Sequence, residues 1–469
     1  MKNLLLVFSA ALLLVSAVPA MSSAATAAAP GISGLSKAVA TRSDRLVITG
    51  RAFGAPSSSS HVLVAGQAAS VTTWTDNSIT MYVPEFARLG VAAIQVVTAG
   101  GSSNPVAIHL QNRPAAGRIA WRFEMSGMYA LSRPATGPDG TVYEVDVAGH
   151  LYALTPAGAL KWIFNGAGPN GLSIGADGTI YTGDESAIVA VNPSGALKWR
   201  YTENPRAFIL LGPNVGPDGN IYAVADEGLG VFSLTPAGRL RWSIPERYDR
   251  QIVAHQEIVF GPAGTRQQLY FHANHHFKGI TLRGQTRFTV DGDGNQPAVA
   301  PDGTVVTHTW TIGAGSVLYG YDPRTGQPKW SFYISPNNIA SAPDVDKNGN
   351  TYVGWNLAYM YALSPDGQQR WKFTEPGLGI LYDPIVNPGG TVVIAGGQPN
   401  YGEIGFFESI NASNGTLLWK RSMGTDPATG QPVVPFSRAR FSADGNMAFA
   451  SAIVLGVYDH SFLFGVKTN

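Results

Sequence analysis

The stretch TPAGALKW (residues 155–162) recurs in nearly the same form as NPSGALKW (192–199) and TPAGRLRW (235–242). Each copy reads as a tight turn, in which glycine supplies a left-handed backbone, followed by a short strand that carries one tryptophan. Such a phrase describes structure and not chemistry. Its recurrence predicts that the chain is built from copies of one supersecondary unit.

The spacing of glycine and aromatic residue in this phrase occurs eight times. The pairs are Gly117/Trp121, Gly158/Trp162, Gly195/Trp199, Gly238/Trp242, Gly284/Phe288, Gly326/Trp330, Gly367/Trp371 and Gly415/Trp419. A second marker recurs in phase with the first: a turn such as GPDG (137–140), followed by a strand such as TVYEVDV (141–147). Two markers in one period of about 40–45 residues predict a β-propeller, in which each repeat is one blade of four antiparallel strands.

The two ends of the repeat region predict how the ring closes. GRIAWRF (117–123) has no earlier strands of its own blade, and residues 434–469 supply three strands without a tryptophan strand. Together they complete one blade, so we expect eight blades, with the chain ends paired in one sheet and no free edge left between them. A seven-bladed ring is the alternative, because blade four (261–288) departs from the pattern.

The repeats resemble those of a known propeller family. YDPRTGQPKW (321–330) and INASNGTLLW (410–419) are similar to the docking repeat of pyrroloquinoline-quinone (PQQ) propellers, and the full match is carried by Asp322, Thr325, Gly326 and Trp330. The resemblance extends over residues 117–469. It implies the propeller fold but no particular cofactor, because the same repeat builds quinoprotein dehydrogenases and a non-enzymatic outer-membrane assembly lipoprotein.

Residues 31–112 form a separate unit. DRLVITGRAFG (44–54) and the segments that follow it alternate apolar and polar residues between short turns, which predicts a small β-sandwich. The unit resembles the IPT/TIG family of immunoglobulin-like domains, and the resemblance is carried by Gly50, Phe53, Gly54, 75–84 and 96–104. Such domains serve as spacers or binding modules, and we expect Phe53 to lie in the core.

The first residues favour export. Lys2 is followed by an apolar run of about 15 residues, shorter than the roughly 20 that span a bilayer, and by small residues suited to cleavage. We therefore expect residues 1–25 to be a signal peptide, and a soluble periplasmic or extracellular protein without a transmembrane segment. The chain has no cysteine, which excludes disulfides and a lipid-modified amino-terminal cysteine.

The amino-acid composition limits the classes of molecule that the protein is expected to bind. Charged residues are 13% of the chain and the formal net charge is +1, without any run of Lys or Arg, so we expect no nucleic-acid binding. Protein or polysaccharide is the expected partner, and we expect a monomer.

Two groups of residues are candidate ligand-binding sites. His272, His275 and His276 lie at the predicted hairpin between the second and third strands of blade four, on the face of a propeller that usually binds ligands. Imidazoles are good zinc or copper ligands, but adjacent strand residues point to opposite sides, and a solvated hairpin with one packed histidine is the alternative. Trp310 and Trp355 fall outside the repeated docking position, so they are available to bind a sugar or a peptide, or to cap the core.

These observations favour an exported, non-enzymatic binding or scaffold protein that uses the propeller face to bind protein or glycan. The alternative is a metal-dependent, polysaccharide-degrading enzyme, lyase-like, centred on blade four. A second alternative is a PQQ-dependent dehydrogenase, which in many members of that class uses a vicinal cysteine pair that this chain lacks. We expect no catalytic residues, no metal ligands and no cofactor, with PQQ or a divalent metal as the alternatives not favoured.

Overall fold

The structure is a computed structural model of the whole chain. It describes residues 28–468 apart from 42–44, 58, 85–86, 112–116, 128, 131, 185, 249–256, 263–266, 312–314, 336–340, 356–358, 375–379, 382, 399–401 and 458. The predicted signal peptide, residues 1–25, lies outside the described residues. All regular elements in the described part of the chain are β-strands, which confirms the predicted all-β class.

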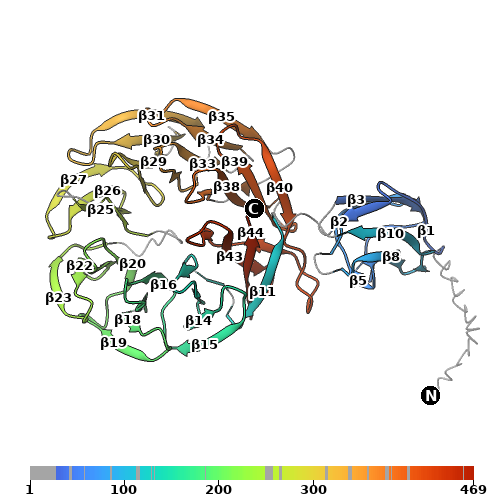
Figure 1. The fold of residues 1–469 in the computed structure, drawn as a ribbon, viewed down its shortest axis with the longest axis horizontal. Helices are drawn as coiled ribbons and strands as arrows, with labels where there is room; N and C mark the ends of the chain where they lie inside the picture. The colour runs from blue at the N-terminus through green and yellow to red at the C-terminus, as the bar shows by residue number, and fades with distance from the viewer. Residues whose placement is uncertain are drawn as a thin grey trace, which may run out of the picture.

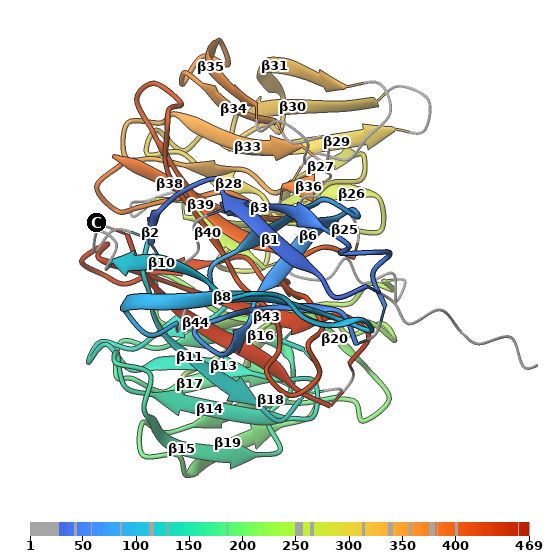
Figure 2. The ribbon, with the colours of Figure 1, turned by 90° about the vertical axis from the view of Figure 1, so that its right-hand side faces the viewer.

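The amino-terminal unit is a sandwich of two sheets, with strand orders β1-β3-β7-β6 and β2-β10-β8-β4-β5, and β9 beside β8 (Figures 1 and 2). The strands are β1 (Gly31–Leu35), β2 (Val39–Thr41), β3 (Arg45–Arg51), β4 (His61–Val64), β5 (Gln67–Ala68), β6 (Ser70–Trp74), β7 (Ser78–Tyr82), β8 (Gly90–Thr98), β9 (Gly101–Ser102) and β10 (Val106–Gln111). Phe53 is 1% exposed in the core of the sandwich, as expected. A Cβ at Gly50 would lie 2.3 Å from the Phe53 ring, so this glycine makes room for it.

The rest of the described chain forms eight sheets arranged in a ring, which we number as blades 1 to 8 (Figure 1). Blade 1 contains β12 (Ala135–Thr136), β13 (Val142–Val145), β14 (His150–Leu154) and β15 (Leu160–Asn165). Blade 2 contains β16 (Asn170–Ile174), β17 (Ile180–Gly183), β18 (Ile188–Val191) and β19 (Leu197–Tyr201). Blade 3 contains β20 (Ile209–Val215), β21 (Ile221–Ala225), β22 (Gly230–Leu234) and β23 (Leu240–Ile244).

Blade 4, the divergent repeat, keeps the same four-stranded order. It contains β24 (Val259–Phe260), β25 (Gln268–Ala273), β26 (His276–Thr281) and β27 (Thr286–Asp291). Blade 5 contains β28 (Ala298–Val299), β29 (Val305–Thr311), β30 (Gly315–Tyr321) and β31 (Pro328–Ser335). Blade 6 contains β32 (Asp344–Val345), β33 (Thr351–Trp355), β34 (Tyr359–Leu363) and β35 (Gln369–Thr374). Blade 7 contains β36 (Ile380–Leu381), β37 (Ile385–Val386), β38 (Val392–Gln398), β39 (Phe406–Asn411) and β40 (Leu417–Ser422).

Blade 8 is shared by the two ends of the propeller. Its outer strand is β11 (Ile119–Met125), and its other strands are β41 (Val433–Pro435), β42 (Arg440–Phe441), β43 (Met447–Val454) and β44 (Ser461–Lys467). β11 pairs antiparallel with β44, in a register that places Arg122 opposite Phe464 and Glu124 opposite Phe462. This pairing closes the ring in the predicted way (Figure 1).

Apolar side chains are buried between the blades rather than at one common centre. The described residues of the ring form eight hydrophobic clusters, and each cluster combines residues of two neighbouring blades. The cluster between blades 1 and 2, for example, contains Val145 and Leu151 of one sheet and Leu172 and Val189 of the next. Each blade is a sheet with two apolar faces, so its stability depends on both neighbours.

The repeated aromatic residue packs on a glycine of the following blade. A Cβ on that glycine would lie 2.4–2.8 Å from the ring, and each of these glycines has a φ between +69° and +89°. The pairs are Trp121 with Gly158, Trp162 with Gly195, Trp199 with Gly238, Trp242 with Gly284, Phe288 with Gly326, Trp330 with Gly367, Trp371 with Gly415 and Trp419 with Gly117. Glycine is therefore required twice at each position, for its backbone conformation and for its lack of a side chain.

Hydrogen bonds reinforce this docking. The indole N–H of Trp199 donates to the carbonyl oxygen of Pro236 in the next blade at 2.9 Å, and Trp121, Trp162, Trp242 and Trp371 make the equivalent bond. Phe288 has no N–H. At its position Nε2 of Gln268, in the second strand of blade 4, donates to the carbonyl oxygen of Pro323 at 2.9 Å instead. A different donor thus preserves the contact between blades 4 and 5.

Candidate functional site

The two faces of the ring differ in regularity. We call turn face the side with the turns that join the first to the second strand (such as 137–140) and the third to the fourth strand (such as 155–158) of each blade. We call hairpin face the side with the hairpins between the second and third strands (such as 274–275) and the connections between blades. Antiparallel strand order places these two sets of connections at opposite ends of the strands.

Polar groups of the turn face are used within the protein. In blade 2, the carboxylate of Asp177 accepts hydrogen bonds from the Thr179 N–H at 3.0 Å, from its hydroxyl at 2.8 Å and from Lys198 Nζ at 3.1 Å. The backbone hydrogen bond from Thr179, with those from its hydroxyl and from Lys198, lowers the pKa of Asp177 to about 2. Blades 1 and 5 repeat the clamp with Asp139, Thr141 and Lys161 and with Asp302, Thr304 and Lys329. The clamp ties the first turn of a blade to its outer strand.

The hairpin face is irregular, and its hairpins differ from blade to blade. Glu227 in blade 3 and Asn274 and His275 in blade 4 have left-handed backbones, with φ values of 51°, 49° and 60°. Asn274 and His275 form a two-residue turn that joins the paired Ala273 and His276. Non-glycine residues in this conformation carry strain of about 1–3 kcal/mol and occur often at functional sites.

The three candidate histidines of blade 4 point to different surroundings. His272 is 6% exposed, and its Nε2 lies 2.8 Å from the hydroxyl of Thr307 in blade 5. His275 is exposed, and its Nδ1 lies 2.7 Å from Asp293. His276 Nδ1 lies 3.0 Å from Asp291. Burial is the main cause that lowers the pKa of His272 to about 3, and the charge of His308 is the second cause. This imidazole is therefore neutral inside the folded propeller.

This arrangement separates the group that the sequence places together. Within the described residues, no group of three or more His, Cys, Asp or Glu side chains could hold a metal ion. His275 and His276 lie on the hairpin face, whereas His272 lies between blades 4 and 5. A ligand-binding role of these three residues stays a prediction.

Trp310 and Trp355 end up near the hairpin face by their place in the strands. Trp310 lies near the end of β29, opposite Ser316, and Trp355 is the last residue of β33, opposite Tyr359. Their side chains lie outside the described part of the structure, so their binding role also stays a prediction.

Sequence reasoning missed a polar cluster between blades 8 and 1. His150 Nδ1 lies 2.9 Å from Asp146 Oδ2 and 3.3 Å from Ser126 Oγ, and the Tyr152 hydroxyl donates to Asp146 at 2.7 Å. Burial is the main cause that raises the pKa of Tyr152 to about 12. The set resembles a Ser-His-Asp triad in composition. In a triad, however, the histidine uses one nitrogen for the aspartate and the other for the serine, and here both share Nδ1, so the serine is not activated in that way.

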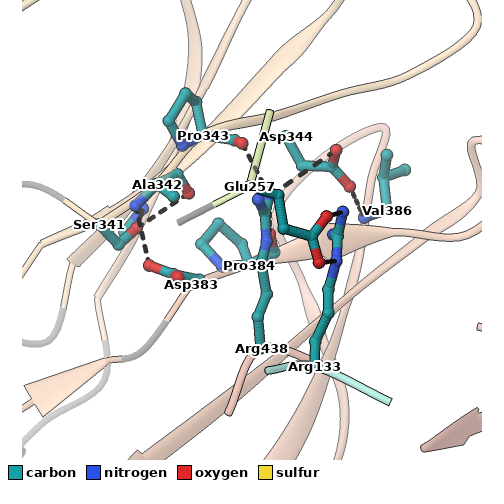
Figure 3. A network of polar contacts seen from close by, with 11 residues as sticks. Arg133, Glu257, Ser341, Ala342, Pro343, Asp344, Asp383, Pro384, Val386 and Arg438 are labelled. Carbon is teal, nitrogen blue, oxygen red and sulfur yellow. Dashed lines mark hydrogen bonds and ion pairs between the residues drawn. The ribbon is translucent and has the colours of Figure 1, made fainter. Parts of the chain in front are cut away.

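A second missed cluster lies beside the first strands of several blades, which are the inner strands of the ring in Figure 1, and Figure 3 shows its contacts. Arg133, next to β12 of blade 1, makes a two-pronged ion pair with Glu257, next to β24 of blade 4, and its Nε lies 2.7 Å from Glu257 Oε1. Glu257 is 7% exposed. Burial alone would raise the pKa of Glu257, but the positive charges of Arg133 and Arg440 hold it below its ordinary value. The pair connects two blades that are not neighbours.

The same cluster joins blades 6, 7 and 8. Arg438 is 5% exposed and donates from one terminal nitrogen to the carbonyl oxygens of Pro343 at 2.7 Å and Pro384 at 3.2 Å (Figure 3). Asp344 accepts from the Val386 N–H at 2.8 Å, and Asp383 accepts from the Ala342 N–H at 2.8 Å. The repulsion of Arg133 is the main cause that lowers the pKa of Arg440 to about 10. These contacts fix the inner strands, so the cluster acts as a structural hub.

The fold and both faces define a β-propeller joined to an immunoglobulin-like domain. Residues 110–274 and 285–452 match the family model described as outer membrane protein assembly factor BamB, and the chain belongs to this family of PQQ-like propellers. Residues 30–110 match the IPT/TIG domain. Both findings confirm the resemblances inferred from the repeats and from the sandwich strands.

Solved structures agree with this fold. The crystal structure of BamB from Moraxella catarrhalis is 13% identical with a TM-score of 0.52, and the match covers 74% of this chain and 98% of that one. The structure of the Dos1 propeller is 13% identical with a TM-score of 0.57, and the match covers 74% of this chain and 93% of that one. At this identity the likeness shows the fold alone. No curated protein matches the chain.

Within the described residues, there is no apolar helix long enough to cross a bilayer.

Proposed function

We propose that this chain is an exported, non-enzymatic binding or scaffold protein whose hairpin face binds another protein. Export rests on residues 1–25, whose composition is that of a cleaved signal peptide, so the mature chain works in the periplasm or outside the cell. Membership in the BamB-like family favours protein over polysaccharide as the partner.

The difference between the two faces carries this proposal. On the turn face, Asp-Thr-Lys clamps use the polar groups of the first turn in blades 1, 2 and 5 for contacts within the same blade. On the hairpin face, the tips differ between blades, and Glu227 and His275 project from left-handed turns. Binding loops vary on a rigid scaffold, and this division of labour is typical of recognition surfaces.

The chemistry of the described clusters favours binding over catalysis. His150 contacts both Ser126 and Asp146 through the same nitrogen, Nδ1. The three histidines of blade 4 do not point to a common site. The central arginines and carboxylates are committed to contacts between inner strands. A metal-dependent lyase or a PQQ-dependent dehydrogenase would need a different set of residues in these places.

Photo-crosslinking from each face tests the proposal. A photoreactive amino acid at His275, whose side chain is 61% exposed, probes the hairpin face, and the same amino acid at the exposed Ser194 probes the turn face. Irradiation with an envelope extract should give one discrete protein adduct from position 275 and none from position 194. Equal adducts from both positions, or saturable glycan binding without any protein adduct, would contradict it.

A further inference from the structure

Blade 5 has a buried histidine on each of its faces. His272 reaches it from β25 of blade 4, where its ring stacks on Phe277 at 5.1 Å and its Nε2 meets the Thr307 hydroxyl of β29 at 2.8 Å. A Cβ at Gly294 would lie 2.5 Å from the His272 ring, so the imidazole has no room to move in that direction. Its hydrogen bond is part of the contact between blades 4 and 5.

The second histidine belongs to blade 5 itself. His308 follows Thr307 in β29 and is 1% exposed. It pairs with Leu318, so the two side chains share one face of the sheet. Leu318 packs against Val353 and Tyr361 of blade 6, which places His308 on the side of blade 6.

Among the described residues, no acidic side chain supplies either imidazole with a compensating charge. Burial lowers the pKa of His308 to about 4, and it lowers that of His272 to about 3 against the opposing effect of a hydrogen bond with the Gly292 backbone. Nδ1 of His308 is buried without a hydrogen-bond partner in the described structure. The nearby charged groups have other partners. In blade 4 these are Lys278 with Glu246, His275 with Asp293 and His276 with Asp291, and in blade 6 Lys372 lies over the Tyr359 and Tyr361 rings.

We propose that blade 5 is an acid-labile blade, which separates from blades 4 and 6 when His272 and His308 take up protons. Both rings are neutral in the closed ring and gain their ordinary basicity once the blade opens to water. Their contribution to stability is therefore complete above about pH 6.5 and falls as the pH drops toward 4. The inference does not depend on the proposed partner binding.

The size of the effect follows from the two protonation equilibria. An exposed histidine has an ordinary pKa of about 6.5, so at pH 5.0 protonation of one exposed ring raises the equilibrium constant for opening of the blade about 30-fold over its value at neutral pH. Two histidines give about 1000-fold. The other blades should change far less over this range, because the described parts of their seams carry no second pair of this kind.

Hydrogen exchange of the wild-type chain tests this directly. Protection factors of amides in β29 and β30 of blade 5 are compared at pH 7.5 and 5.0 with those of β21 and β22 of blade 3, after correction for intrinsic exchange. We expect a loss of about 1000-fold in blade 5 and a small loss in blade 3. An equal loss in both blades would mean global unfolding and would overturn the proposal, as would unchanged protection in blade 5.

Variants assign the effect to the two rings. His272→Gln and His308→Gln should each reduce the pH-dependent loss in blade 5 to about 30-fold, and the double variant should abolish it. His275→Gln, at the exposed tip of the same hairpin, is the matched control and should leave the loss at about 1000-fold. A reduced loss in this control would contradict the assignment. If the buried variants do not fold, the comparison of blades in the wild-type chain decides.

Discussion

The indole of Trp419, in the last strand of blade 7, covers the backbone of Gly117 at the start of blade 8. A Cβ at Gly117 would lie 2.5 Å from Cδ2 of Trp419, and the Gly117 N–H donates to the carbonyl oxygen of Lys467 at 2.6 Å. One glycine thus receives the docking ring of the preceding blade and pairs with the carboxyl-terminal strand. The ring closes through the same docking contact that joins every other pair of blades.

Replacement of a docking glycine should cost more than its backbone conformation alone explains. Gly238 and Gly219 both lie in blade 3, with φ values of +75° and +77°. A Cβ at Gly238 would lie 2.7 Å from the Trp199 ring, whereas a Cβ at Gly219 would meet nothing within 4 Å. Gly219→Ala should cost about 1–2 kcal/mol for the left-handed backbone. Gly238→Ala should cost a further 1–3 kcal/mol, roughly, for displacement of the indole.

Urea unfolding of the two variants measures this difference. The shared blade and the matched φ make Gly219→Ala the control for backbone strain. Equal destabilisation by both substitutions would show that the indole does not press on Gly238.

The indole N–H should contribute a small, separable part of each docking contact. Trp199→Phe keeps an aromatic ring and removes the 2.9 Å hydrogen bond to Pro236, so it should lower the free energy of unfolding by about 0.5–1.5 kcal/mol. Trp199→Ala removes the ring as well and should cost about 3–5 kcal/mol. Thermal and urea unfolding give both values. A Phe variant as unstable as the Ala variant would contradict the idea that the ring supplies most of the contact, as Phe288 does in blade 4.

Removal of one partner of the central ion pair should cost much more stability than removal of both partners together. Glu257→Gln leaves Arg133 buried among Arg438 and Arg440 without its carboxylate, and should destabilise the fold by about 3–5 kcal/mol. The double variant Arg133→Met/Glu257→Leu removes both charges and should be closer to the wild type. A double-mutant cycle from urea unfolding checks the coupling. Additive losses would mean that the two side chains do not interact.

The clamps of the turn face should contribute little and should be sensitive to salt. Lys198 and Asp177 are 39% and 57% exposed, so Lys198→Met should cost at most about 1 kcal/mol, and less at high salt. Asp177→Asn should cost more, because this carboxylate also accepts both hydrogen bonds from Thr179. Since the pKa of Asp177 is lowered to about 2, its contribution is present above pH 4, roughly, and is lost as the pH falls toward 2. Unfolding in low and high salt tests the order of the two variants.

Local signals allowed the fold to be predicted. The docking glycine and its aromatic partner recur at a fixed spacing, and the absence of earlier strands before Trp121 indicated the shared blade that β11 and β44 form. Even blade 4 kept enough of the pattern to be recognised. Its substitute donor, Gln268, gave no signal, because a glutamine in a second strand has no fixed role in the repeat.

The sites were harder to predict because their residues meet only in three dimensions. Arg133 and Glu257 stand in connections of blades 1 and 4, and each reads as an ordinary loop residue until the ring closes. His272 looked like a partner of His275 because they are close in sequence. Strand β25 is buried on both faces, so no alternation of polar and apolar residues marked His272 as an interior residue.

Engineered disulfides test the shared blade most directly, since the chain has no cysteine of its own. Glu124 and Phe462 lie opposite each other in β11 and β44, and opposite residues have Cα atoms about 4.5–5.5 Å apart, within the range that a disulfide spans. Glu124→Cys/Phe462→Cys should form an intramolecular disulfide in the folded protein, whereas the mismatched pair Glu124→Cys/Leu463→Cys should remain reduced. Failure of the matched pair to form it, with the variant folded, would contradict a ring closed by its two chain ends.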